Sequence, residues 1–270
     1  MATNSSPIHT GRGSTALLMT LLAVSVAITT ASAVTTAVIM NLDGEPNRWL
    51  GTFFQLIHIG RELSVSTWFA SALWLLLAVI AFTAGVLADS KRGYWFAFGA
   101  IAAIASMDET ATLHENFYLA GSALTAYLPF DFFSYRWVIV GVIIAIVVAV
   151  SLLPFVLSLP RPVTIGIIVG GAIFLAGAIG LETLGGHAAA QYGDTSWQLH
   201  ALMHVEEFFE YIGVAIAVYA LSGMVRLVHS NEPRAIVFTG YRTDLEQENA
   251  SPSNDGDASL VIEANESPRI

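Results

Sequence analysis

Acidic and imidazole side chains occur within long apolar stretches of this chain. They are Asp108, Glu109, His114, Glu115, Glu182, His200, His204, Glu206, Glu207 and Glu210. A charge at the centre of a bilayer costs at least about 2.5 kcal/mol, so such residues pair, line water or bind an ion. Carboxylate and imidazole groups together are also the ligands of zinc, manganese and non-haem iron.

The first group of these residues lies near position 110. At about 100° per residue, Asp108 and Glu115 share one helix face, and Thr112 lies between them. A continuous helix places Glu109 to one side and turns His114 well away from both acids. A single small site therefore need not use all four ionisable residues.

The second group lies near position 205. His200, His204 and Glu207 form one stripe at i, i+4 and i+7, and Glu206 and Glu210 form a second stripe about 100° round the helix. Two histidines four residues apart on a helix can bind one metal ion. The chain lacks the strict Glu-x-x-His pair of di-iron sites in helix bundles.

We therefore predict a divalent metal ion as cofactor, either zinc or iron or manganese. The expected ligands are Asp108, Glu109, His114, Glu115, His200, His204, Glu206 and Glu207. Glu182 or Glu210 is the expected general base that activates a metal-bound water.

The stretches that carry these residues have the length of membrane-spanning helices. The chain has 270 residues, of which 55% are hydrophobic and 12% are charged, whereas a soluble domain carries about 25% charged residues. A span takes about 20 mostly apolar residues. Six such stretches lie at 15–40, 64–88, 95–119, 137–158, 163–185 and 199–225. The sequence thus predicts an all-α polytopic membrane helix bundle with six transmembrane helices.

Charge and cysteine content exclude several classes of protein. The net charge of −10 does not suit a nucleic-acid partner. The absence of cysteine excludes disulfides, cysteine-ligated zinc, iron–sulfur clusters and thiol catalysis.

The lysines and arginines predict the orientation, because they are retained on the cytoplasmic side. With the N-terminus inside, eight of the 11 are cytoplasmic, and Arg48, Arg61 and Arg136 are outside. We therefore expect an N-in, C-in protein of the plasma membrane. At 1.5 Å per residue, Asp108 and Glu210 then lie about 16 Å from the outer ends of their spans. The ionisable residues all fall in the outer half, which predicts a polar cavity that opens outward.

The two ends of the chain differ from the transmembrane domain at 15–228. Residues 1–14 are expected to be a cytoplasmic segment, and 229–270 a disordered acidic cytoplasmic tail, because that composition buries little apolar surface. Arg12, the apolar run from Leu17 to Ile28 and Ala31-Ser32-Ala33 are similar to a signal peptide. The apolar run continues to Met40, which favours an uncleaved helix.

Three motifs carry a resemblance to known proteins. Asp108-Glu109 with His114-Glu115, the run from Gly177 to Glu182, and Glu206-Glu207-x-x-Glu210 resemble a broad family of uncharacterised bacterial multi-span membrane proteins. The resemblance covers about 60–225 and implies no assigned activity.

A looser similarity is to the transmembrane zinc hydrolases of the alkaline ceramidase and adiponectin receptor kind. It rests on Ser106, Asp108, His114 and the His200-xxx-His204 pair. It implies a zinc hydrolase, although that family has seven spans, a different Ser–His spacing and fewer glutamates at its site.

The leading hypothesis is a metal-dependent, hydrolase-like membrane enzyme that acts on a lipid or other amphipathic substrate from the outer leaflet. Membrane lipid is its expected partner, and the sequence indicates neither a nucleic-acid partner nor an oligomeric state. One alternative is a proton- or ion-coupled transporter or channel, because intramembrane acids also form proton pathways. The other is a structural or partner-binding membrane protein with a polar core network. His58 and Arg61 are read as interfacial residues, with the Arg61 side chain extending to the headgroups.

Overall fold

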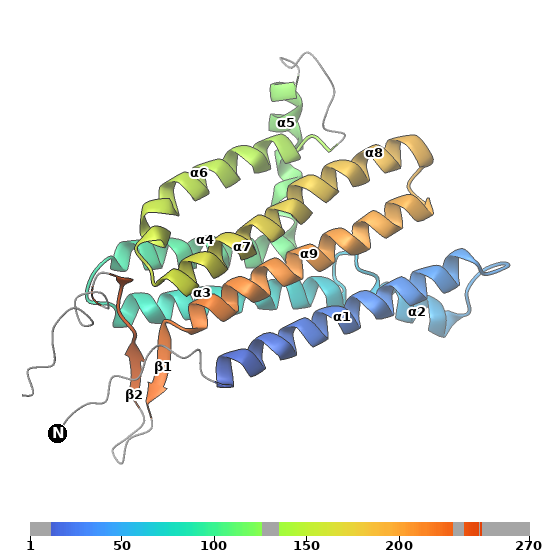
Figure 1. Ribbon diagram of the computed structural model, residues 1–270. Helices are drawn as coiled ribbons and strands as arrows, with labels where there is room; N and C mark the ends of the chain where they lie inside the picture. Colours follow the sequence, from blue (N-terminus) through green and yellow to red (C-terminus); the bar gives the residue numbers. More distant parts are fainter. Residues whose placement is uncertain (1–11, 126–134, 229–234, 243, 245–270) are drawn as a thin grey trace, which may run out of the picture.

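Long helices form the body of the protein (Figure 1), which we describe from a computed structural model. The structure describes residues 12–125, 135–228, 235–242 and 244. Its long helices run along a common direction. They are α1 (Arg12–Met40), α3 (Val65–Leu87), α4 (Arg92–Ala111), α6 (Val138–Leu157), α7 (Arg161–Leu175), α8 (Glu182–Tyr192) and α9 (Trp197–Ser222). The short helices are α2 (Arg48–Ile57), the 3₁₀ helix η1 (Leu113–Phe117) and α5 (Tyr118–Thr125).

Four helical segments are long and apolar enough to cross a membrane, within the described ranges. They are Gly13–Met40, Val65–Leu87, Val138–Leu157 and Arg161–Tyr192. The last combines α7 and α8 with the π-helical segment η2 (Ala176–Leu181) that joins them. Helices α4 and α9 have similar length but carry the acidic residues. The chain is therefore a membrane protein built mainly of helices.

The N-terminus of some helices is capped by a polar side chain. The side chain of Asn47 accepts from Leu50 N at the start of α2, and that of Ser196 accepts from Leu199 N at the start of α9. Such caps satisfy backbone donors that have no partner inside the helix. The described helix boundaries follow local polar signals where the apolar runs stop.

Helix α9 lies at the centre of the bundle and packs against α1, α3, α7 and α8. Glycines let α7 approach it closely. A Cβ added at Gly170 would lie 2.5 Å from the carbonyl oxygen of Gly213, and one at Gly166 would lie 2.5 Å from Cβ of Ala220. Small residues allow this kind of close backbone approach in membrane bundles.

The predicted span at 95–119 is not one continuous helix. Helix α4 ends at Ala111, and Thr112 adopts a left-handed conformation with φ 45° before η1 begins at Leu113. The composition of the stretch does not predict this break, because the left-handed conformation of a single residue leaves the apolar content of a span unchanged.

Residues 235–242, within the segment expected to be a disordered tail, have described structure, and a short two-stranded hairpin accompanies the helical bundle that the sequence predicts. Strand β2 (Ala235–Phe238) pairs antiparallel with β1 (Val225–Val228), in the register Val225 to Phe238. Tyr241 is buried, accepts a hydrogen bond from Trp95 Nε1 and donates one to the Ser90 carbonyl. The overall polarity of 229–270 conceals the short apolar run that forms β2. The remaining tail at 245–270 lies outside the described residues.

The close α7–α9 contact predicts the outcome of a matched pair of substitutions. Gly170→Ala pushes the two backbones apart, and we expect it to destabilise the fold by about 1–3 kcal/mol. A Cβ at the neighbouring Gly171 meets nothing within 4 Å, so Gly171→Ala should be neutral or slightly stabilising. Thermal unfolding of the two detergent-solubilised variants measures this difference. Equal unfolding temperatures would contradict the packing.

Candidate functional site

Five glutamates from three helices interact electrostatically within the bundle. We call Glu109 of α4, Glu182 of α8, and Glu206, Glu207 and Glu210 of α9 the carboxylate cluster. Glu207 interacts electrostatically with Glu109 and Glu182. Glu210 interacts with Glu207 and Glu109. All five are half-buried, so the cluster is largely, but not fully, removed from solvent.

Glu182 and Glu206 form a pair across the contact between α8 and α9. The two carboxyl groups interact electrostatically, and Oε2 of Glu206 lies 3.9 Å from the position of a Cβ added at Gly185 of α8. Two adjacent carboxyl groups cannot both be ionised at low cost, and a hydrogen bond between them needs a proton on one of the two. Two carboxyl groups that face each other are therefore able to hold one proton between them.

The π-helical segment η2 positions this pair. It directly precedes Glu182 and packs against α9. A Cβ added at Gly177 of η2 would lie 2.9 Å from the Glu206 carbonyl oxygen and 3.0 Å from Cγ of Glu210. Single-turn π segments inside α-helices occur frequently at functional sites. Here the π turn lies beside the acidic residues of α9.

Tyr211 adds a hydroxyl group to the cluster. Its side chain is 1% exposed, and its hydroxyl finds no close hydrogen-bond partner among the described residues. Glu207 and Glu109 are the acids that act most strongly on it. Tyr211 follows Glu207 by four residues, which places both on one face of α9.

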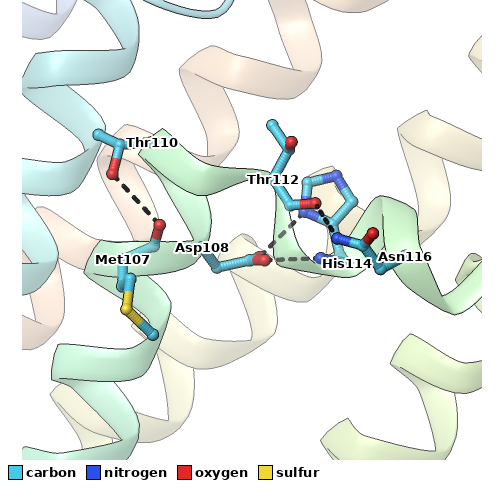
Figure 2. A network of polar contacts seen from close by, with 6 residues as sticks. All are labelled: Met107, Asp108, Thr110, Thr112, His114 and Asn116. Carbon is cyan, nitrogen blue, oxygen red and sulfur yellow. Dashed lines mark hydrogen bonds and ion pairs between the residues drawn. The ribbon is translucent and has the colours of Figure 1, made fainter.

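Asp108 is engaged at the break between α4 and η1 (Figure 2). Its two carboxylate oxygens accept from the backbone N of His114 at 2.8 Å and pair with Nδ1 of the same residue at 3.0 Å. The His114 ring also contacts Trp137, with ring centroids 4.4 Å apart. The expectation that His114 turns away from Asp108 was wrong, because the left-handed Thr112 redirects the chain.

Two of the expected residues lie away from the carboxylate cluster. Glu115 is exposed on η1. His187, which the sequence places one turn after Glu182, is exposed on α8, and its Nδ1 contacts the Thr183 carbonyl at 2.7 Å.

His204 belongs to a different polar contact, at the end of the bundle where α2 lies. Its Nδ1 contacts the His200 carbonyl at 2.6 Å, and its Nε2 contacts the Ser32 hydroxyl of α1 at 3.0 Å. A carbonyl only accepts, so Nδ1 carries the proton and Nε2 accepts from Ser32. Ser32 in turn accepts from the backbone N of Ile59 at 2.9 Å.

His58 is part of the same region and is not merely interfacial. It is 5% exposed, and its ring centroid lies 5.5 Å from that of His200 and 6.1 Å from that of His204. Sequence reasoning missed Ser32 as a functional candidate. The sequence did contain a signal for a polar face on α1, because Ser25, Ser32 and Thr36 follow helical spacing. In the structure all three side chains are buried.

Several of the expected metal ligands already have partners within the protein. Asp108 is held by His114, and both ring nitrogens of His204 are occupied. Throughout the part of the chain that the structure describes, no three histidine, aspartate or glutamate side chains are placed to hold one metal ion. The donor types suit a metal, but their arrangement does not fit one as it stands.

The helices and the acids between them define a class: a helical membrane protein with a polar core. The sequence profile of the family described as Domain of unknown function (DUF8692) matches residues 13–224, and the chain belongs to that family. No curated protein and no solved structure matches the chain. The similarity to alkaline ceramidases and adiponectin receptors finds no support in these comparisons.

The Ser32 contact predicts a specific loss of stability. Ser32→Ala leaves the Ile59 N–H and Nε2 of His204 without a partner, which should destabilise the protein by about 1–3 kcal/mol. Ser25→Ala is the matched control, since Ser25 is equally buried but bonds only the Leu21 carbonyl of its own helix. Thermal unfolding of both variants tests the contact, and equal stability would contradict it.

The engaged ligands also predict the metal content. We expect the protein, purified in detergent without added metal or chelator, to carry no stoichiometric zinc, iron or manganese. Elemental analysis by mass spectrometry measures this directly. One ion per chain, removed by Asp108→Ala or His204→Ala in correctly folded protein, would instead favour the metal-dependent enzyme.

Proposed function

We propose that this membrane protein is a proton-coupled transport protein, in which the carboxylate cluster takes up and releases protons within the membrane. The observation that carries the proposal is the Glu182–Glu206 pair, whose two carboxyl groups interact electrostatically where α8 packs on α9. Buried acids that face a bundle interior are typical of proton relays in pumps and transporters.

The depth of the cluster supports this proposal. Glu206 and Glu210 lie roughly 14 and 20 Å along α9 from its start, in a helix about 39 Å long. They therefore lie near the middle of the longest acidic helix. A group at that depth can exchange protons with either side of the membrane if the surrounding helices move.

Two interruptions of regular helix flank the cluster. The left-handed Thr112 follows α4 shortly after Glu109, and η2 ends directly before Glu182. Irregular backbone at membrane depth is tolerated where it is buried in protein or lines a water-filled cavity. Transporters commonly place such broken helices at their ion and substrate sites.

The same proposal includes six membrane crossings, by α1, α3, α4, α6, the combined α7–α8 rod, and α9. It also includes the N-in, C-in orientation, which the distribution of Lys and Arg favours, and a plasma-membrane location in a bacterial host. In this orientation the α2 end of the bundle faces outward and the β-hairpin end faces the cytoplasm.

A metal-dependent enzyme acting on a lipid or amphipathic substrate is the alternative. The observation that favours it is the hydrogen bond from a histidine Nδ1 to a backbone carbonyl in α9, an arrangement common in metal-ligating histidines. The metal analysis above distinguishes the two proposals.

Proton flux into proteoliposomes tests the transport proposal. With a valinomycin-imposed potassium potential and an internal pH dye, we expect uptake above that of empty liposomes. Glu206→Gln should reduce the rate at least about tenfold, because the amide cannot exchange a proton.

Glu115→Gln is the matched control, because Glu115 is exposed on η1 and lies outside the cluster. It should retain the wild-type rate. Flux equal to that of empty liposomes, or flux unchanged in Glu206→Gln, would overturn the proposal.

A further inference from the structure

Three histidines gather at the α2 end of the bundle. We call His58, from the segment between α2 and α3, and His200 and His204 of α9 the histidine cluster. The His58 ring stands nearly perpendicular to both others, at 87° to His200 and 80° to His204. The cluster is distinct from the carboxylate cluster, which lies further along α9.

The unusual feature of the histidine cluster is its unused hydrogen-bonding capacity. Both ring nitrogens of His58 and Nδ1 of His200 are buried without a partner among the described residues. Buried polar groups nearly always have a partner, so each exception calls for an explanation. An imidazole with both nitrogens free can accept a proton at one and release one at the other.

The third histidine is held in one orientation by hydrogen bonds. The Ile59 N–H donates to Ser32, the Ser32 hydroxyl donates to Nε2 of His204, and Nδ1 of His204 donates to the His200 carbonyl. These bonds anchor His204 between α1 and α9. The His58 ring, whose two nitrogens have no hydrogen-bond partner among the described residues, lies next to the His204 ring.

His200 and His204 also lie between the α2 end of the bundle and the carboxylate cluster along α9. At 1.5 Å per residue, His200 and His204 lie roughly 5 and 11 Å along α9 from its start. Glu207 follows His204 by three residues, less than one helical turn. The histidines therefore occupy the part of α9 between the α2 end and the carboxylates.

We infer that the histidine cluster is the route by which protons pass between the α2 end of the bundle and the carboxylate cluster. The inference rests on the proposed function and adds its access route. A proton passes from water to one nitrogen of His58, leaves from the other, and continues through water-bridged steps to the carboxylates. No bond other than those to the moving proton changes.

The electrostatic surroundings keep His58 uncharged between transfers. Burial, followed by the neighbouring His200 and His204 rings and by Arg61, lowers the pKa of His58 to about 4. Phe54 of α2 also contacts the ring, at a centroid distance of 4.6 Å. A neutral imidazole of this kind does not trap the proton that it passes on.

Deuterium exchange of the shared carboxyl proton tests the inference. The protein in lipid nanodiscs is transferred from H₂O to D₂O, and the carboxyl C=O band that Glu182→Gln and Glu206→Gln abolish is followed by infrared spectroscopy. We expect His58→Phe and His58→Gln to slow this exchange at least about tenfold. The band itself should persist in both variants.

His187→Phe is the matched control, since His187 is exposed on α8 at the same end of the bundle. It should exchange at the wild-type rate. A wild-type band with unchanged exchange in both His58 variants would overturn the histidine route alone. Absence of the band from the wild-type protein would overturn the proposed function and the route together.

Discussion

Carboxyl groups held between apolar helices are the constraint on which the rest of this structure depends. Water would stabilise the charges of five glutamates at little cost, but a bundle interior does not. The acids of α9 therefore interact with those of α4 and α8, and Glu182 pairs electrostatically with Glu206. The helix that carries most of the acids is also the helix around which the others pack.

Close helix packing and irregular backbone both serve this arrangement. Because Gly170 and Gly213 have no side chain, α7 and α9 approach closely. The backbone carbonyl oxygen of each glycine lies almost where a Cβ on the other would be. Beyond that contact, η2 widens the helix by a π turn and places Glu182 beside Glu206. On the other side of the cluster, Thr112 ends α4 shortly after Glu109. The regular helices place the glutamates in the same part of the bundle, and the irregular segments at Thr112 and η2 set the direction of the chain next to them.

Particular residues show how far the sequence could predict the site. Helical spacing correctly placed Glu206 and Glu210 on one face of α9, and both join the cluster. The same reasoning failed for His114, because it assumed a continuous helix where Thr112 breaks it. Helical spacing also could not predict that His58 lies beside His200 and His204, because 142 positions separate His58 from His200 along the chain.

The sequence by itself determined the class of protein, because long apolar runs and a low content of charge admit only a membrane environment. It also determined which residues are costly to bury and therefore need partners. Only the tertiary structure decided which partner each one has. Periodicity describes one helix at a time, whereas contacts such as that of Ser32 with His204 depend on how separate helices rotate and approach one another.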